Sequence, residues 1–370
     1  MPPSKTAISK DGIKVANQYK PSQNYHDEVM KTNIVRLREV LDELPPFMKQ
    51  YFRGIEEYTA SRTRLSYAYD IRLFFEFLHE TNPSLKNTEI KDFPLSVLDN
   101  VKREDIEEYL EYLSLYEKKD REITNDERGK ARKLSSLRSL YKYFFTSELI
   151  KTNAPSLVSP PKIHQKEIIR LEPDEVANLL DMVEEGEKLT PNQLRFHNKT
   201  KYRDVAILTL MLGTGIRVSE LVGLDINNID FNTNGILIRR KGGKEATVYF
   251  GDEVYTALTD YLEIRNRIIP EAGSENALFL SLQNKRLCVR SVENLVKKYA
   301  SNLTSIKKIT PHKLRSTYGT SLYRETGDIY LVADVLGHKD VNTTKKHYAA
   351  IEDERRRSAA NIVKLRENHD

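Results

Sequence analysis

Two basic side chains in the stretch TPHKLRSTYGTSLY, residues 310–323, have the types and the spacing to bind an anion. A threonine followed by a proline suits the N-cap and the first position of a helix, so a helix is predicted to begin at Pro311. His312 and Arg315 would then lie three residues apart on one face, near the positive end of that helix. Phosphate is the anion that fits this pair best. A solvated basic helix face is the alternative for the motif taken alone.

A second arginine and a lysine lie earlier in the chain. In TGIRVSEL, Arg217 follows a glycine-containing turn at the start of a predicted helix, and Glu220 lies one turn further on. In GILIRRKGGKEATVYF, β-branched and aromatic residues flank Gly242 and Gly243, which is typical of a β-hairpin. Lys241 would lie at the mouth of that turn. Taken singly, these features predict only a helix ion pair and a solvated turn lysine.

The stretch LGHKDVNTTKKHYAAI supplies a second histidine and a candidate nucleophile. His338 follows a helix that should end at Gly337, and Tyr348 would lie on a new helix capped around 342–344. A phenol with an unperturbed pKa of about 10 needs nearby cations and a base before it attacks phosphorus. A single tyrosine among the 20 of this chain is more often a core or surface residue.

Several other chemistries lack their motifs. The sequence has no G-x-x-x-x-G-K-[ST] phosphate loop, no H-E-x-x-H and no G-x-S-x-G. It also has no obvious carboxylate cluster to hold two metals for phosphoryl transfer. Cleavage of a phosphodiester would therefore depend on side chains alone, so we expect neither a cofactor nor a metal.

The elements that must position these groups fall into two predicted domains. Residues 1–30 are polar and aperiodic and predict a flexible arm, and 31–153 predict a helical bundle. Three prolines within 154–168 predict a stiff linker, and 169–370 would form the second domain. The polar run at 184–201 is interpreted as an irregular insertion. Apolar faces of the bundle recur at helical spacing at Ile71, Phe74, Phe75 and Leu78, at Ile106, Tyr109, Leu110 and Leu113, and at Leu134, Leu137, Tyr141 and Phe144. With the hairpin, this predicts a mainly α protein with a small β-sheet (α+β).

Composition is that of a globular protein in the cytosol. The 370 residues are 39% hydrophobic and 31% charged, and no apolar run approaches the roughly 20 residues that cross a bilayer, so no membrane insertion is expected. The start, MPPSKTAISKDGIK, has no apolar core of the secretory kind, and the single Cys288 excludes an intramolecular disulfide.

A net charge of +5 permits a polyanionic partner. The basic residues cluster at Arg239, Arg240, Lys241 and Lys244, at Lys307, Lys308, Lys313 and Arg315, and at Lys339, Lys345 and Lys346.

Taken together, these motifs resemble the signature of the tyrosine recombinases, the phage-integrase and Xer superfamily. The matching residues, in chain order, are Arg217, Lys241, His312, Arg315, His338 and Tyr348. The resemblance covers about 50–365 and is most specific over 213–348. PLSVLDNVKREDIEEYLEYL, RKGGK and TPHKLR resemble the XerS branch, which uses a single recombinase. The resemblance implies an N-terminal helical core-binding (SAM-like) domain and a C-terminal tyrosine-recombinase catalytic domain.

One spacing differs from many Xer proteins. The gap from His338 to Tyr348 is one residue longer than theirs, and the shorter gap would end at His347, which cannot be a phenolic nucleophile. The longer gap resembles that of many phage and transposon integrases. Tyr348 is therefore the predicted nucleophile, and an integrase of a mobile element is an alternative to the Xer type.

The implied roles agree with the residue types. A phosphodiester is a poor electrophile until its non-bridging oxygens are neutralised, and Arg217 with Arg315 could bind both oxygens. By resemblance, and by its place beside Arg315, His312 would accept the proton of Tyr348.

The resemblance supplies three further roles. Lys241 would protonate the departing 5′ oxygen, and His338 would hydrogen-bond the phosphate. Glu220 would orient the arginine on its own helix. A phosphotyrosine bond keeps the phosphodiester energy, so rejoining would need neither ATP nor metal.

The implied partner is a double-stranded DNA recombination site, held as in a C between the two domains. A homotetramer would exchange strands between two such sites through a Holliday junction, and the chain after Tyr348 would form a helix that docks into a neighbour. A cell-division DNA translocase or an accessory DNA-bending factor is a further possible partner. The expected task is resolution of chromosome dimers at a dif-like site. The alternatives are an integrase or excisionase of a mobile element, a topoisomerase-like relaxing enzyme, and a catalytically inactive architectural or regulatory DNA-binding protein.

Overall fold

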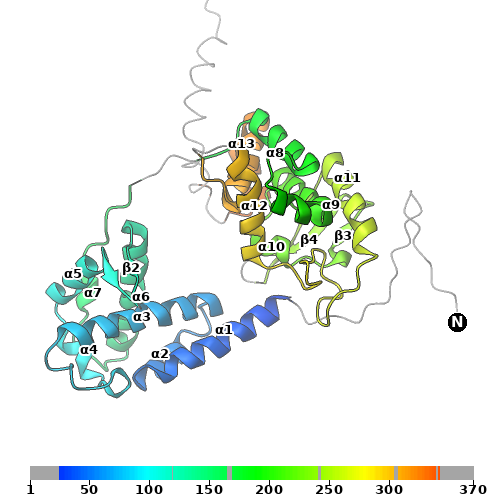
Figure 1. Ribbon diagram of the computed structural model, residues 1–370. Helices are drawn as coiled ribbons and strands as arrows, with labels where there is room; N and C mark the ends of the chain where they lie inside the picture. The colour runs from blue at the N-terminus through cyan, green and yellow to red at the C-terminus, as the bar shows by residue number, and fades with distance from the viewer. Residues whose placement is uncertain are drawn as a thin grey trace, which may run out of the picture. The chain divides into compact units, whose positions relative to one another are not determined.

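The computed structural model describes residues 25–118, 120–164, 169–240, 243–303, 307–338 and 341 (Figure 1). The described residues form two compact units, one within 25–164 and the other within 169–341. Both units are mainly helical with short antiparallel strands. In the described part of the chain, no helix is both long enough and apolar enough to cross a membrane.

The first unit is a helical bundle with one two-stranded ribbon. Its elements are α1 (Tyr25–Asp42), α2 (Phe47–Gly54), α3 (Ser61–Thr81), the 3-10 turn η1 (Ile90–Asp92), α4 (Ser96–Asn100), α5 (Arg103–Tyr112), β1 (Tyr116–Glu117), β2 (Glu122–Ile123), α6 (Glu127–Thr146) and α7 (Ala154–Leu157). The core lies where α3 packs against α1 and α6. Ile71, Phe74 and Phe75 on α3 are 0% exposed, which confirms the apolar face predicted from their spacing. Burial of each such side chain contributes about 2 kcal/mol to folding.

The helical bundle begins earlier in the chain than the sequence predicted. The helix α1 begins at Tyr25, so 25–30 are helical rather than part of an arm. Asp27 and Glu28 lie in its first turn, where negative charge stabilises the exposed N–H groups of a helix. Residues 1–24, the rest of the predicted arm, lie outside the described residues.

The linker, in turn, begins later in the chain than the predicted residue 154. Ala154 and Pro155, in α7, and Val158 are buried in the core of the first unit. Proline is tolerated in the first turn of a helix, where its missing N–H leaves no hydrogen bond unmade. Arg138 on α6 donates from Nε to the carbonyl oxygen of Pro155 (3.0 Å) and from Nη2 to that of Val158. The first residues of the expected 154–168 linker are therefore part of the bundle.

The second unit carries the remaining helices and a three-stranded sheet. Its elements are α8 (Pro173–Glu185), α9 (Pro191–Thr214), α10 (Val218–Val222), the 3-10 turn η2 (Ile226–Asn228), β3 (Ile229–Asp230), β4 (Gly235–Arg239), β5 (Glu245–Tyr249), α11 (Asp252–Arg265), α12 (Val289–Leu303), α13 (Pro311–Thr326) and α14 (Ile329–Leu336). The long helix α9 packs against α8, α11 and α13 (Figure 1).

The start of α9 corrects the expected irregular insertion at 184–201. Helix resumes at Pro191, directly after Thr190 as N-cap. The Thr190 hydroxyl accepts from the backbone N–H of Gln193 (3.3 Å), and the Gln193 side chain accepts from the backbone N–H of Thr190 (3.0 Å). This reciprocal capping box allows a polar sequence to begin a helix. Only residues 186–190 separate α8 from α9.

The predicted hairpin is confirmed. β4 pairs antiparallel with β5 from Gly235 opposite Tyr249 to Arg239 opposite Glu245, and β3 adds a third strand beside β4. Ile236 is 0% exposed and therefore faces the core. At the turn, Gly243 adopts a positive φ of 78°, a conformation that favours glycine.

Candidate active site

The end of α14 is the feature around which the predicted site residues gather. Gly337 has a φ of 60° and ends the helix, as the sequence predicted. Its N–H donates to the carbonyl oxygen of Asp334 (2.8 Å), and the N–H of His338 donates to that of Ala333 (2.9 Å). These two bonds form a Schellman motif, which fixes the backbone of the residue after the glycine. The motif thereby fixes the main chain that carries His338.

Three arginines donate to the next three carbonyls of this helix end. Nη2 of Arg240 lies 3.0 Å from the oxygen of Val335. Arg315 donates from Nη2 to the oxygen of Leu336, and Nη2 of Arg217 lies 3.1 Å from that of Gly337. The last carbonyls of a helix have no partner within it and carry partial negative charge, so guanidinium groups stabilise them. These arginines come from the β4–β5 turn, from α13 and from the start of α10.

Arg315 joins two helix ends. Besides its bond to α14, it donates from Nη1 to the carbonyl oxygen of Gly215, the residue that ends α9. Gly215 has a φ of 63°, and a Cβ there would lie 2.5 Å from the ring of Tyr318 and 2.9 Å from Leu336. Only 7% of Arg315 is exposed. Its guanidinium is therefore a structural tie as well as a candidate phosphate ligand.

Arg217 is held by a carboxylate on its own helix. Its backbone N–H and its Nη1 donate to the two carboxylate oxygens of Glu220, at 2.9 and 2.8 Å. Glu220 is buried, at 5% exposure, whereas 35% of the Arg217 side chain is exposed. A buried carboxylate that accepts both bonds restricts the orientation of the guanidinium. Part of Arg217 thus stays accessible to an anion.

The structure places His312 one turn before Arg315. The helix α13 begins at Pro311 with Thr310 as N-cap, as predicted. His312 is exposed near the N-terminal end of this helix, where the dipole favours bound anions. The structure therefore brings Arg217, Arg315 and the main chain of His338 together, and places His312 on the helix of Arg315.

Two of the six predicted residues lie outside the described residues. Lys241 directly follows Arg240, whose backbone N–H donates to the carbonyl oxygen of Lys244 (2.7 Å) across the turn. Tyr348, together with the predicted cap at 342–344, follows the last described residue, Val341.

Two other tyrosines near the site are poor nucleophiles. Tyr318 on α13 is partly buried against Gly215, and burial raises the pKa of its phenol. Tyr323 is 5% exposed and packs with Val332 and Leu336. Both rings serve the packing of α13 against its neighbours.

Nothing in the sequence indicated the role of Arg240, and three members of the basic clusters bind groups of the protein itself. Arg240 and Arg315 bind main-chain carbonyls. Lys307 forms an ion pair with Glu175, with its Nζ 2.5 Å from one carboxylate oxygen. No local motif distinguishes a cation that binds carbonyls from a solvated one, because the acceptors lie far away in the sequence.

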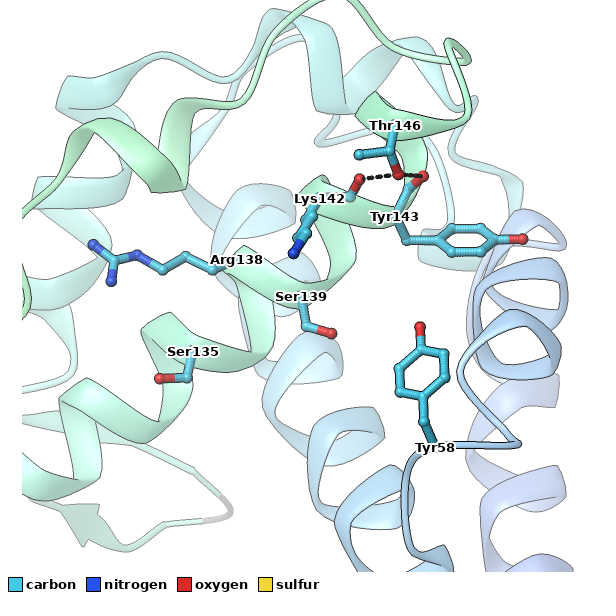
Figure 2. A pocket seen from close by; sticks show the side chains of 7 residues that line it. All are labelled: Tyr58, Ser135, Arg138, Ser139, Lys142, Tyr143 and Thr146. Carbon is cyan, nitrogen blue, oxygen red and sulfur yellow. Dashed lines mark hydrogen bonds between the residues drawn. The ribbon is translucent and has the colours of Figure 1, made fainter.

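The first unit offers a separate polar pocket of about 530 Å³ along α6 (Figure 2). Its lining is basic and hydroxyl-rich, with Tyr58, Ser135, Arg138, Ser139, Lys142, Tyr143 and Thr146. Tyr58 is 73% exposed, and no acidic side chain among the described residues lines this pocket. Such a lining suits a phosphate backbone.

Comparison with known proteins assigns the family. Residues 169–355 match the phage integrase family. A tyrosine recombinase XerC of Caldanaerobacter subterraneus subsp. tengcongensis is 32% identical over 331 residues, which cover 86% of each chain. A tyrosine recombinase XerS of Streptococcus pneumoniae is 32% identical over 359 residues, which cover 89% of this chain and 98% of the relative. The chain belongs to the phage integrase family, the tyrosine-type site-specific DNA recombinases.

Solved structures share the fold. XerH recombinase bound to a palindromic difH substrate superposes with a TM-score of 0.62 at 19% identity, over 90% of this chain and 89% of that chain. The integrase of the transposon Tn1549, in complex with circular intermediate DNA, gives a TM-score of 0.56 at 21% identity, over 81% and 94%. This likeness concerns the fold alone, and it confirms the mainly helical architecture expected from the sequence.

Proposed function

We propose that this protein cleaves and rejoins duplex DNA through a covalent 3′-phosphotyrosine intermediate on Tyr348. The observation that carries the proposal is the meeting of Arg217, Arg315 and the main chain of His338 at one helix end. Cations from separate elements converge there, as a transition state with charge on several oxygens requires.

The two arginines would neutralise the non-bridging oxygens of the scissile phosphate. Arg217 has a partly exposed side chain, and Glu220 orients its guanidinium. Arg315, which is 7% exposed, reaches the same region. His338, next to the carbonyl that Arg217 holds, would donate a hydrogen bond to the phosphate.

Proton transfer is assigned to three further side chains. Tyr348 would attack phosphorus while His312, near the N-terminal end of α13, accepts its proton. Lys241, on the β4–β5 turn, would protonate the 5′ oxygen as it leaves. The phosphotyrosine bond conserves the energy of the broken phosphodiester, so the 5′ hydroxyl of a partner strand can reverse the reaction without ATP or metal.

The biological task we propose is resolution of chromosome dimers at a dif-like site, by a homotetramer that exchanges strands between two sites. Support comes from the pneumococcal XerS relative, which matches over 98% of its length. The XerH structure with its difH substrate shares the fold. A DNA translocase of cell division or a DNA-bending factor would assist. Action in the cytoplasm follows from a chromosomal substrate.

A mobile-element role is the second candidate. Its support is the longer spacing from His338 to Tyr348 and the fold shared with the Tn1549 integrase. Recombination assays with a dif-like site and with element ends would separate the two roles. Recombination of element ends alone would replace the chromosomal role.

The first unit would hold the DNA backbone through the pocket along α6. Lys142 and the exposed ring of Tyr58 lie at this pocket beside serine and threonine hydroxyls (Figure 2). Ammonium and hydroxyl groups bind phosphate oxygens without reading sequence, which positions a recombinase on its site.

A nicked suicide substrate tests the covalent step. The wild type should give an SDS-stable protein–DNA adduct, because the broken strand diffuses away and cannot rejoin. Tyr348→Phe should bind the same DNA with unchanged affinity and give no adduct. An adduct of undiminished yield from this variant would refute Tyr348 as the nucleophile. Loss of the adduct in the wild type as well would favour the inactive DNA-binding protein.

A further inference from the structure

The chemistry proposed above leaves Arg240 without a role, although its guanidinium lies at the same helix end as those of Arg217 and Arg315. Its Nη2 lies 3.0 Å from the carbonyl oxygen of Val335, and its Nη1 lies 3.5 Å from that of Asp334. The side chain thus reaches from the β4–β5 turn across to the last turn of α14.

Glycine at 337 provides the space for this contact. A Cβ built on Gly337 would lie 2.3 Å from Nη1 of Arg240, 2.5 Å from Cζ and 2.8 Å from Nε. The guanidinium therefore packs directly against the residue that precedes His338. A side chain at 337 would displace it.

The main chain of Arg240 is anchored on the other side. Its N–H donates to the carbonyl oxygen of Lys244 (2.7 Å), and its carbonyl accepts from the N–H of Gly243 (3.1 Å). The turn also continues the paired strands β4 and β5. Arg240 is thus a link between a well-anchored hairpin and the helix end that carries His338.

We propose that Arg240 is a positioning residue for DNA cleavage, which acts by holding the end of α14 so that His338 meets the scissile phosphate. The inference rests on the proposed function. The Schellman motif satisfies the carbonyls of Ala333 and Asp334, and Arg315 and Arg217 satisfy those of Leu336 and Gly337. Loss of Arg240 leaves Val335 without its guanidinium partner and frees the helix end from the hairpin.

A double-mutant cycle in single-turnover cleavage tests this role. The variants are Arg240→Ala, His338→Ala and the combination of both, each on a suicide substrate at saturating protein. Arg240→Ala should slow cleavage by about 10- to 100-fold, the cost of a misplaced group near the reacting atoms. In the His338→Ala background the same change should cost less than about threefold, because the residue that Arg240 positions is already gone.

Matched variants separate positioning from general damage. Arg267→Ala removes an exposed arginine beyond α11 and should cleave at the wild-type rate. Arg240→Lys keeps the charge but lacks the planar fork, so it should recover part of the loss. DNA affinity should stay near the wild-type value in Arg240→Ala, and its melting temperature should fall less than that of Arg315→Ala, because the bonds of Arg240 are less buried. If that variant does not fold, Arg240→Lys enters the same cycle.

Two outcomes would overturn the inference. One is wild-type cleavage by Arg240→Ala, and the other is full multiplication of its loss with that of His338→Ala, which would indicate a role independent of His338. Both outcomes can be observed only if the wild-type protein cleaves the substrate. Absence of the adduct in the wild type would instead contradict the proposed function.

Discussion

At the scale of single residues, the two proposed phosphate ligands differ in what else they do. Arg315 donates to the carbonyl oxygens of Gly215 and Leu336 and is 7% exposed. Arg217 donates to one carbonyl and one carboxylate, and 35% of its side chain is exposed. Removal of Arg315 would leave two acceptors at helix ends without that donor.

This difference predicts separable effects of two alanine variants. Arg217→Ala and Arg315→Ala should each slow cleavage by about 100-fold or more, because each removes a preorganised donor to the transition state. Arg315→Ala should also lower the free energy of unfolding by about 2–4 kcal/mol, since each unsatisfied buried acceptor costs about 1–3 kcal/mol. Cleavage assays and urea unfolding measure the two effects. Equal stability of the two variants would contradict the structural role of Arg315.

The proposed role of Lys241 as general acid can be tested by changing the leaving group of the DNA substrate. A general acid is needed only when the 5′ oxygen departs, and a 5′-bridging sulfur leaves without protonation. Lys241→Ala should therefore cleave normal DNA poorly and the sulfur substrate at nearly the wild-type rate, whereas Arg217→Ala should not be rescued. Rescue of Lys244→Ala instead would place the acid after the glycine pair. Equal impairment of Lys241→Ala on both substrates would reduce this lysine to a phosphate contact.

At the scale of elements, helices with a periodic apolar face were predicted correctly from the sequence, whereas a helix with a polar sequence was missed. The spacing of Leu134, Leu137 and Phe144 predicted the buried face of α6, because repeated apolar positions directly reflect a core. The polar first half of α9 was missed, although its capping box is visible as TPNQ. Its burial depends on partners about 100 residues away, such as the Tyr299 hydroxyl 3.0 Å from Nδ1 of His197.

In the candidate site, too, the features that depend on the local sequence were predicted and the long-range contacts were not. Motifs identified the helix start at Pro311 and the helix end at Gly337, since both depend on local backbone preferences. The bonds from Arg217 and Arg240 to α14 join residues 120 and 95 positions apart. Such contacts arise from the fold, and single-sequence patterns carry no signal for them.

A buried polar cluster ties α9 to α12. Asp204 is 1% exposed and accepts from the hydroxyls of Thr200 and Tyr299, each at 3.0 Å. It also accepts from the cations Arg203 and Lys298, at 2.7 and 3.2 Å.

His197, 2% exposed, borders this cluster through Tyr299. Burial, and secondarily the nearby charge of Lys298, lower the pKa of its imidazole. The folded protein therefore holds His197 neutral at pH values where the unfolded chain, with a histidine pKa of about 6.5, begins to bind a proton.

This arrangement predicts acid destabilisation of the second unit. Stability should fall as the pH drops through about 6.5 towards the lower folded pKa, because the unfolded state takes up the proton first. His197→Gln should lose less stability than the wild type between pH 7.5 and 5.5. Thermal melts followed by circular dichroism measure the difference, since the chain has no tryptophan. Parallel curves for the two proteins would contradict the role of His197.

At the scale of the whole molecule, each unit contributes a different part of the proposed reaction. The first unit offers a basic, hydroxyl-rich pocket along α6, and the second gathers the arginines at the end of α14. DNA affinity and cleavage rate should therefore respond to different variants.

A variant of Lys142 tests whether DNA binding and cleavage depend on different units. Lys142→Ala should weaken DNA binding and reduce the slope of log affinity against log salt by about one, the effect of one lost phosphate contact. Cleavage at saturating protein should be unchanged, because the proposed reacting groups belong to the second unit. Lys86→Ala, an exposed lysine of the first unit that does not line the pocket, is the control. Equal salt slopes for the two variants would remove the pocket from the DNA interface.

The whole proposed reaction depends on a covalent bond between DNA and Tyr348. The most direct measurement is peptide mapping by mass spectrometry of the adduct trapped on a suicide substrate, after digestion of the DNA and the protein. We expect a nucleotide-modified peptide that contains Tyr348, with the fragment ions placing the nucleotide on that tyrosine. A modified peptide that contains Tyr318 or Tyr323, or an adduct through a histidine such as His347, would contradict it.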